Sequence, residues 1–263
     1  MFNQVTIIGC GLIGSSILRC LKKNGSIKKL ISFDNDRAVN DVIKKENLSH
    51  EIASSPSEAV KNSDLVLIST PLSSFESVIN SIKDNLKSGS ILTDTCSVKK
   101  GINEIAKKII SKNTIWIPGH PVAGTENSGP RAGFADLFRD RWTIITPDEN
   151  IKDSDIKKIT FFWESMGSKV KIMPADDHDK ILSLTSHLPH VIAYNIVKTA
   201  MGDDEKTKND IIRYSAGGLR DFTRIAASDP GMWKDIFIDN SSLIIEAIDK
   251  FSKNLNDFKN AIK

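Results

Sequence analysis

The segment VTIIGCGLIG, residues 5–14, decides the fold prediction for this chain. A short apolar run, typical of a buried strand, is followed by glycines with the spacing G-x-G-x-x-G at Gly9, Gly11 and Gly14. Between a strand and a helix, the first glycine permits a tight turn and the second lets the backbone approach a pyrophosphate. The third glycine lets the helix pack closely on the strand. The segment therefore predicts the first βα unit of a dinucleotide-binding domain.

Residues beyond this segment complete the predicted cofactor site. The helix that starts near Leu12 and Ile13 offers free backbone amides and a partial positive charge to the phosphates. Asp34 lies 20 residues beyond the third glycine, at the end of the second predicted strand. Its carboxylate would accept hydrogen bonds from a ribose diol and repel a 2′-phosphate, which favours NAD over NADP. Thr70 and Pro71 follow a later strand, at the carboxyl end where ligands of open α/β sheets lie.

Short apolar runs alternate with helix-length amphipathic segments through the first two thirds of the chain. Strands are predicted at residues 5–8, 30–33, 65–69, 91–93, 115–117, 143–145 and 169–173. Helices are predicted at residues 16–23, 74–86, 100–111 and 153–166. Strands that alternate with helices indicate βαβ units and a parallel sheet. We therefore expect an α/β Rossmann-type dinucleotide-binding domain over residues 1–173.

The pattern changes after Pro174, because no further strand is predicted. Helical periodicity is found at residues 176–186, 191–201, 206–216 and 235–251. We expect an all-α domain over residues 174–263 that contributes to substrate binding and to dimerisation. A helical unit of this size has more apolar surface than a monomer readily buries, which predicts a homodimer.

Composition excludes several classes of protein. Hydrophobic residues make up 40% of the chain and charged residues 26%, as in ordinary globular proteins. The net charge of +3, from 36 basic and 33 acidic side chains, argues against a nucleic-acid-binding surface. No apolar stretch has the length of a membrane span. Cys10, Cys20 and Cys96 lack C-x-x-C or metal-site spacing, so we expect a reduced, cytoplasmic protein with no metal site.

Two polar segments at predicted strand ends carry candidate catalytic residues. His120 lies between two prolines, in a loop that follows the strand at 115–117, where a neutral imidazole could act as general base. A purely structural loop histidine is the alternative. Ser97 follows the strand at 91–93 and is interpreted either as the N-cap of the next helix or as a ligand contact. Cys96 is interpreted as a buried thiol rather than a nucleophile.

The helical part carries a second group of candidates. His187 and His190 are three residues apart in S-H-L-P-H and share a helix face, where they could bind substrate, bind a metal or pack. Carboxylate and cysteine ligands are missing nearby, which favours substrate binding over metal. Arg220 and Arg224 are four apart, so both guanidinium groups lie on one face and could bind carboxylates. A solvated basic face is the alternative.

Five motifs together resemble the prephenate/arogenate dehydrogenase family over nearly the whole chain. They are GCGLIGSS at 9–16, DTCSVK at 94–99, GHPVAGTE at 119–126, SHLPH at 186–190 and GGLRDFTRIAASDPGMW at 217–233. The last three in this order are much more specific than the glycine loop. The resemblance implies a Rossmann-type domain followed by a helical dimerisation domain, with NAD as cofactor and a role in tyrosine biosynthesis.

The resemblance also implies roles for individual residues. His120 matches the catalytic histidine that contacts the substrate ring hydroxyl, and Ser97 matches a serine that helps hold this hydroxyl. Arg224 matches an arginine that binds a substrate carboxylate, and Arg220 falls where the family often carries a basic residue near the substrate.

Further positions of the substrate site follow from the same match. His190 corresponds to another histidine of the substrate pocket, whereas His187 is a substrate-binding candidate only from its position in SHLPH. Glu126 and Asp221 match acidic positions near the site entrance. Trp233 matches a tryptophan that lines the pocket.

The expected activity is oxidative decarboxylation of prephenate to 4-hydroxyphenylpyruvate, of arogenate to tyrosine, or of both. A dehydrogenase for another small hydroxy acid on the same two-domain plan is the alternative. Such β-hydroxyacid dehydrogenases usually carry a catalytic lysine on the first long helix of the second domain, where this chain has SHLPH. A non-catalytic NAD-sensing protein is a third possibility, which retention of histidine, serine and arginine at the matching positions opposes.

Overall fold

The computed structural model describes residues 2–201 and 205–263, without the side chains of residues 205–208 and 212. The chain divides into two compact units, Met1–His178 and Asp179–Lys263. Each unit is described by itself below. The division falls within one helix, α7 (Ala175–Leu182).

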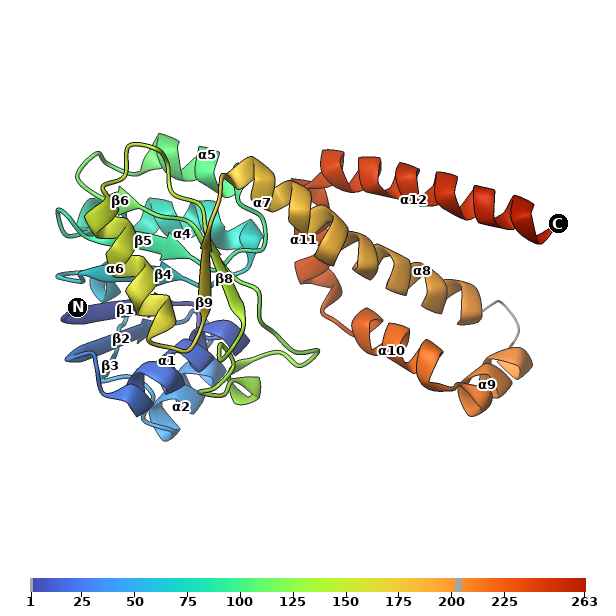
Figure 1. The fold of residues 1–263 in the computed structure, drawn as a ribbon. Coiled ribbons are helices and arrows are strands. Elements are labelled where there is room, and N and C mark those ends of the chain that lie inside the picture. The colour runs from blue at the N-terminus through green and yellow to red at the C-terminus, as the bar shows by residue number, and fades with distance from the viewer. Residues whose placement is uncertain (1, 202–204) are drawn as a thin grey trace. The chain divides into compact units, whose positions relative to one another are not determined.

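A parallel sheet with the strand order β3-β2-β1-β4-β5-β6 forms the centre of the first unit (Figure 1). Its strands are β1 (Gln4–Ile8), β2 (Lys29–Phe33), β3 (Glu51–Ile52), β4 (Leu65–Ile68), β5 (Ile91–Asp94) and β6 (Ile115–Trp116). This is the strand order of Rossmann dinucleotide-binding domains. The central strands are buried on both faces, and β4 is buried at every residue. The predicted Rossmann-type fold is therefore confirmed.

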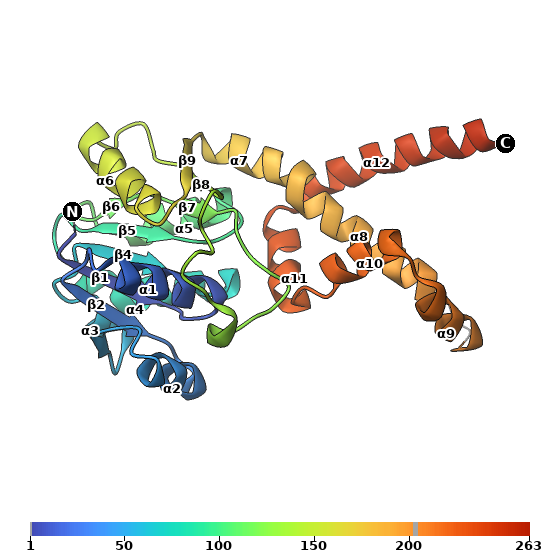
Figure 2. The ribbon, with the colours of Figure 1, turned by 60° about the horizontal axis from the view of Figure 1, so that its bottom comes forward.

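Helices cover both faces of this sheet (Figures 1 and 2). They are α1 (Leu12–Asn24), α2 (Arg37–Lys45), α3 (Pro56–Ala59), α4 (Phe75–Ile82), α5 (Lys100–Ile109) and α6 (Asp153–Glu164). One core cluster joins the sheet to α1 and α6, for example through Ile17, Phe162 and Trp163. A second cluster joins it to α4 and α5 through Phe75 and Ile102. The strand β3 and the helices α2 and α3 were not predicted, since they are short or weakly patterned.

A second, smaller sheet has the order β7-β8-β9. β7 (Gly119–Pro121) runs antiparallel to β8 (Trp142–Ile145), which runs parallel to β9 (Lys169–Ile172). The expectation that His120 lies in a loop is therefore wrong, because His120 pairs with Ile144 in this sheet. Pro121 favours extended backbone at the residue before it, which suits a strand.

The second unit is helical, as predicted. It contains α8 (Leu188–Met201), α9 (Glu205–Tyr214), α10 (Gly217–Ala226), α11 (Pro230–Asp239) and α12 (Ser241–Ile262). Within this unit α8 packs beside α10 and α12 (Figures 1 and 2). The single helix predicted at 235–251 is wrong, because the chain leaves helical geometry at Asn240, with φ −104° and ψ 25°. Among the described residues, no helix is both long and apolar enough to cross a membrane.

A π-helical turn, Ser183–His187, connects α7 to α8. Pro189 lies in the first turn of α8, where its missing N–H costs little, so the chain stays helical through this segment. The irregular turn ends two residues before Pro189, and α8 begins at Leu188.

Candidate functional site

The glycine loop after β1 has the geometry that its spacing predicts. Gly9 has φ +86°, and a Cβ atom there would lie 2.5 Å from the carbonyl oxygen of Ser69. A Cβ at Gly14 would lie 2.0 Å from the Gly9 carbonyl oxygen, so this glycine allows α1 to approach the strand. At Gly11 nothing lies within 4 Å of the Cβ position, which leaves the space that a pyrophosphate would need.

The start of α1 faces this open space. Gly11 is the N-cap and provides no side-chain cap, so first-turn amides can serve a phosphate. Leu12 and Ile13 follow it, and their side chains pack against the core. The loop and the helix terminus together fit a dinucleotide.

Asp34 lies directly beyond β2 and is tied to the glycine loop. Its Oδ2 atom accepts the Cys10 amide at 2.7 Å, and its Oδ1 atom accepts the Asp36 amide at 2.9 Å. The carboxylate is half-buried and its orientation is set by two backbone groups. The predicted ribose contact would come from this oriented carboxylate.

Thr70 and Pro71 follow β4 on the opposite side of the glycine loop from Asp34. The Thr70 hydroxyl is buried and has no hydrogen-bond partner among the described residues. The Thr70 methyl carbon lies 2.8 Å from the Cβ position of Gly9, so this side chain borders the loop. A buried hydroxyl without a partner costs free energy, and a bound cofactor could supply the missing partner. Pro71 is exposed beside it.

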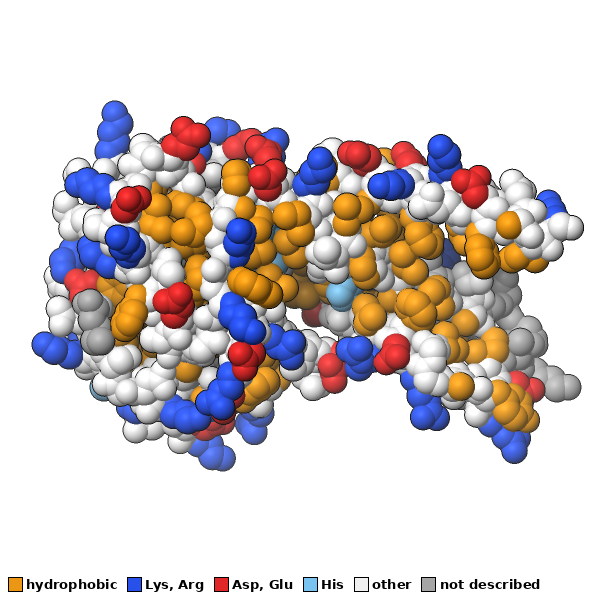
Figure 3. Space-filling model, viewed as in Figure 1, with side chains coloured by type: hydrophobic (Ala, Val, Ile, Leu, Met, Phe, Trp, Pro, Cys, Tyr) orange, Lys and Arg blue, Asp and Glu red, His pale blue; other side chains and the backbone are white. Residues whose placement is uncertain are grey.

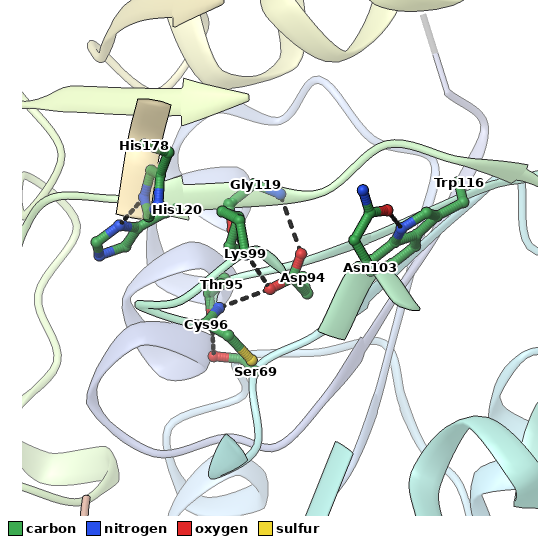
Figure 4. A network of polar contacts seen from close by, with 10 residues as sticks. All are labelled: Ser69, Asp94, Thr95, Cys96, Lys99, Asn103, Trp116, Gly119, His120 and His178. Carbon is green, nitrogen blue, oxygen red and sulfur yellow. Dashed lines mark hydrogen bonds and ion pairs between the residues drawn. The ribbon is translucent and has the colours of Figure 1, made fainter. Parts of the chain in front are cut away.

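A buried ion pair organises the carboxyl end of β5 (Figure 4). The Lys99 ammonium lies 2.5 Å from Asp94 Oδ2, and neither side chain is exposed. Lys99 also donates to the Gly119 carbonyl oxygen at 2.6 Å, and Asp94 Oδ1 accepts the Gly119 amide at 3.0 Å. The residue before His120 is thus held through both its N–H and its C=O.

The same ion pair shapes the segment that carries Ser97. Asp94 Oδ2 accepts the Cys96 amide at 2.8 Å, which turns the chain beyond the strand. Ser97 is half-buried three residues after Asp94. The N-cap interpretation of Ser97 is wrong, because α5 begins at Lys100 and its N-cap is Lys99.

His120 forms a hydrogen bond with His178 (Figure 4). His120 Nδ1 and His178 Nε2 lie 2.8 Å apart, and the two rings meet edge to face. His178 is fully buried in the first turn of α7, and His120 is 7% exposed. The structure thus pairs the candidate base with a second titratable group.

In the second unit, the two histidines of SHLPH both lie beside Trp233 of α11. The ring of His190 stacks on Trp233 with centroids 3.5 Å apart, and the ring of His187 meets it edge-on at 6.2 Å. His187 Nδ1 lies 3.1 Å from the side-chain nitrogen of Asn240, which also donates to the Asp179 carbonyl oxygen. His190 Nδ1 lies 2.9 Å from the Ser186 carbonyl oxygen, so it donates there and leaves Nε2 as acceptor. Burial lowers the pKa of His190, which favours the neutral ring.

The charged candidates are exposed in the single chain. Arg220 and Arg224 lie on α10, and no ion pair joins either to another described residue. Glu126 and Asp221 are exposed as well. The helix α10 is nevertheless not a fully solvated face, because its apolar residues Leu219, Phe222 and Ile225 are half-buried.

Several residues near these sites were missed by the sequence analysis. Asp94 and Lys99 belong to a quoted motif but were given no role, and His178 and Asn240 were not singled out. A histidine within the acidic segment DDHD, residues 176–179, was the available signal for His178. Asn240 interrupts an apolar helical pattern, which is a weak signal for a buried polar contact.

Comparison with known proteins identifies the family. A family model described as the nucleotide-binding domain of prephenate dehydrogenase matches residues 17–172, and one described as its dimerization domain matches residues 174–263. The chain belongs to the prephenate dehydrogenase family. It is therefore an oxidoreductase with an NAD-binding domain followed by the dimerisation domain of that family.

Several relatives match this member of the prephenate dehydrogenase family over most of their own length. Cyclohexadienyl dehydrogenase of Zymomonas mobilis is 39% identical over 262 residues, which covers 100% of the chain and 89% of the relative. Prephenate dehydrogenase of Lactococcus lactis is 30% identical over 261 residues, covering 97% and 70%. The crystal structure of prephenate dehydrogenase from Aquifex aeolicus, in complex with hydroxyphenyl propionate and NAD+, has a TM-score of 0.90 at 30% identity, covering 100% and 91%.

The rival two-domain dehydrogenases share the fold only. A 3-hydroxyisobutyrate dehydrogenase from Mycobacterium tuberculosis is 14% identical, with a TM-score of 0.58 and coverage of 82% of the chain and 72% of that protein. Membership of the prephenate dehydrogenase family thus rests on the two matched family models and on sequence identities of 30% or more, whereas this rival is 14% identical.

Proposed function

We propose that the chain oxidatively decarboxylates prephenate, arogenate or both, with His120 as the general base. The observation that carries this proposal is the placement of His120. Its imidazole is nearly buried, its Nδ1 atom is bonded to His178, and the residue before it is held by the Asp94–Lys99 ion pair. A base held in one orientation can take a proton from a substrate hydroxyl with little reorganisation.

The reaction requires one proton acceptor from the protein. The substrate ring carries a hydroxyl opposite a quaternary carbon that bears a carboxylate. NAD, when bound, accepts the hydride from the carbon that carries the hydroxyl. His120 takes the hydroxyl proton, and the ring carbon becomes a ketone. The C–C bond to the carboxylate then breaks, carbon dioxide leaves, and the bond electrons complete an aromatic ring, so this step is strongly downhill.

Other residues bind and orient the substrate in this proposal. The Ser97 hydroxyl and the His120 imidazole both form a hydrogen bond with the substrate hydroxyl. Arg224 binds a substrate carboxylate through a charge-assisted hydrogen bond, and Arg220, one helical turn before it, adds positive charge. His190 is kept neutral by burial, so its Nε2 atom can accept a substrate hydrogen bond. Its stacking on Trp233 fixes the ring plane.

The proposed enzyme is a homodimer that forms through the helical unit. Along the second half of α12 the apolar residues Phe251, Leu255, Phe258 and Ile262 follow 4-3-4 spacing, so they lie on one helix face. They are between 36% and 72% exposed in the single chain. Figure 3 shows hydrophobic side chains gathered over α8 and the neighbouring part of α12. A second copy would bury this surface, and the matched dimerization domain supports it.

Light scattering tests the dimer. Leu255→Glu places a charge in the apolar stripe and should shift the mass from about twice 29.0 kDa toward 29.0 kDa. Lys253→Glu introduces the same residue on the opposite face of α12 and should leave the mass unchanged. We also propose a cytoplasmic location, since the thiols of Cys10 and Cys20 are free and buried.

The function is tested with purified enzyme, NAD and each of the two substrates, with NADH fluorescence as the readout. Wild-type enzyme should reduce NAD with at least one substrate. His120→Asn cannot accept the proton and should lose on the order of a hundredfold to ten-thousandfold in kcat. His50→Asn is the matched control, because His50 accepts the Leu30 amide far from the proposed base. Equal turnover by His120→Asn and wild type would reject His120 as the base.

A further inference from the structure

We propose that His178 sets the tautomer of His120, so that the Nε2 atom of His120 is the proton acceptor. The inference rests on the proposed role of His120 as base and extends it to a residue that is not part of the substrate contact. His178 is a positioning residue in this proposal, because it acts on the reaction through His120.

The contact between the rings requires a single shared proton. His120 Nδ1 and His178 Nε2 are 2.8 Å apart, which is a hydrogen-bond distance. A neutral imidazole carries one N–H and one acceptor nitrogen, so one of these two atoms must donate and the other must accept. Both rings are buried, and they meet edge to face with an interplanar angle of 68°.

Two arrangements satisfy the hydrogen bond, and they differ in what they leave at His120 Nε2. If His178 donates, the His120 proton sits on Nε2, and His120 has no basic nitrogen for the substrate. If His120 donates through Nδ1, its Nε2 atom carries a lone pair, and the His178 proton sits on Nδ1. Only the second arrangement allows His120 to act as a base, so catalysis selects His178 as the acceptor.

The same bond stabilises His120 after proton transfer. The substrate hydroxyl proton goes to Nε2 of His120, which becomes an imidazolium with protons on both nitrogens. Its Nδ1–H then donates to neutral His178, and a hydrogen bond from a charged donor is stronger than one between neutral groups. His178 therefore favours both the reactive tautomer and the charged product of the proton transfer.

The backbone of α7 holds the acceptor in place. The His178 amide donates to the Pro174 carbonyl oxygen at 3.0 Å, which closes the first turn of the helix. Lys100 of α5 pairs with Asp176 at 2.9 Å and ties this turn to the segment that holds Gly119. The charged residues next to the pair along the chain are Asp176, Asp177 and Asp179, on either side of His178, while Asp94 and Lys99 hold Gly119, the residue before His120.

Two substitutions of similar length separate the acceptor role from a packing role. His178→Gln offers a side-chain carbonyl oxygen near the position of Nε2, whereas His178→Met fills comparable space without a strong acceptor. We expect kcat of His178→Met to fall on the order of tenfold to a hundredfold, with the KM for NAD nearly unchanged. His178→Gln should recover most of kcat. In His178→Met the imidazolium of His120 lacks a hydrogen-bond acceptor, so the acid limb of the kcat profile should move to lower pH. In His178→Gln this limb should stay near wild type.

Nitrogen-15 NMR of histidine-labelled holoenzyme reads the tautomer directly, with His120→Asn and His50→Asn used for assignment. We expect His120 to be protonated on Nδ1 in wild type and in His178→Gln, and to show a mixture of tautomers in His178→Met. His120 protonated on Nε2 in wild type would overturn the inference. So would wild-type kcat in His178→Met while His120→Asn is inactive.

The two proposals fail in distinguishable ways. Undiminished turnover by His120→Asn would reject the proposed base, while the NMR measurement would still report whether His178 sets the tautomer. If His178→Met does not fold, the wild-type spectrum and the pH profile of His178→Gln decide the matter.

Discussion

Lys99 and Asp94 form an ion pair in which neither side chain is exposed, and each partner also holds the backbone of Gly119. Removing one charge from a buried pair leaves the other without compensation. Lys99→Met should therefore lower the free energy of unfolding by about 3–5 kcal/mol. Urea denaturation at a fixed protein concentration measures this change.

The ion pair of Lys29 and Glu51 provides the control, because both of its side chains are about half exposed. Lys29→Met should cost less than about 1 kcal/mol. Adding Asp94→Asn to Lys99→Met removes the unpaired carboxylate and should restore part of the lost stability. Similar losses of unfolding free energy for Lys99→Met and Lys29→Met would show that the buried ion pair stabilises the fold no more than the exposed one.

The two glycines around the start of α1 should respond differently to alanine. Gly11→Ala meets nothing within 4 Å, so the fold should tolerate it, but the new methyl would occupy space needed by the pyrophosphate. We expect the Kd for NAD to rise on the order of tenfold or more while Tm stays near wild type. Gly14→Ala places Cβ 2.0 Å from the Gly9 carbonyl oxygen and should lower Tm as well. Titration and thermal melts test both; a large loss of Tm in Gly11→Ala would contradict this assignment.

Asp34 should determine the choice between NAD and NADP. Asp34→Asn keeps an oxygen that can accept the Cys10 amide but removes the charge that would repel a 2′-phosphate. The ratio of kcat/KM for NAD to that for NADP should fall on the order of tenfold or more. Asp36→Asn is the matched control, since Asp36 caps α2 through Ala38 and asparagine also caps helices. An unchanged ratio in Asp34→Asn would mean that the carboxylate does not face the ribose.

Arg224 should bind a substrate carboxylate. Arg224→Ala removes a charge-assisted hydrogen bond of about 1.5–3 kcal/mol and should raise KM on the order of tenfold to a hundredfold. Arg224→Lys should recover only part of this loss, because an ammonium cannot form the planar two-bond contact. Arg213→Ala, on α9, is the control for a general loss of positive charge and should leave KM unchanged. Normal substrate binding by Arg224→Ala would leave Arg224 as a surface residue.

His190 should make the protein less stable in mild acid. Burial lowers its pKa in the folded state, whereas the unfolded chain keeps a value of about 6.5. Below that pH the unfolded state takes up a proton that the folded state resists, so stability is present above it and declines as the pH falls. His190→Phe keeps a ring that can stack on Trp233 and does not titrate. When the pH is lowered from about 7.5 to about 5.5, wild type should lose more unfolding free energy than His190→Phe. An equal loss of unfolding free energy in the two proteins over this pH range would contradict the prediction.

The glycine loop and the order of elements were predictable because they depend on short-range patterns. Gly9, Gly11 and Gly14 lie within six residues, and their conformations follow from local turn and packing requirements. The central strands are continuous apolar runs, which is the pattern of strands in a sheet that is buried on both faces.

Long-range polar contacts were not predictable from those patterns. The His120–His178 bond joins residues 58 positions apart, and nothing in either local segment specifies its partner. Lys99 was overlooked because a lysine at a helix start is usually exposed, and only the fold shows that it is fully buried. The predicted helix through residue 240 was wrong for the same reason: Asn240 bonds to the Asp179 carbonyl oxygen and His187, two partners outside its own helix.

The π-helical turn Ser183–His187 has a consequence for how this family can vary. Each residue of an α-helix turns the chain by about 100°, so deleting one residue from this turn would rotate α8 relative to the segment before it. His190 would leave the face of Trp233, and His187 would no longer keep its register with Asn240. Insertions and deletions in this turn should therefore be selected against, so the length of the segment is constrained in addition to the identity of its buried residues Ser183 and His187.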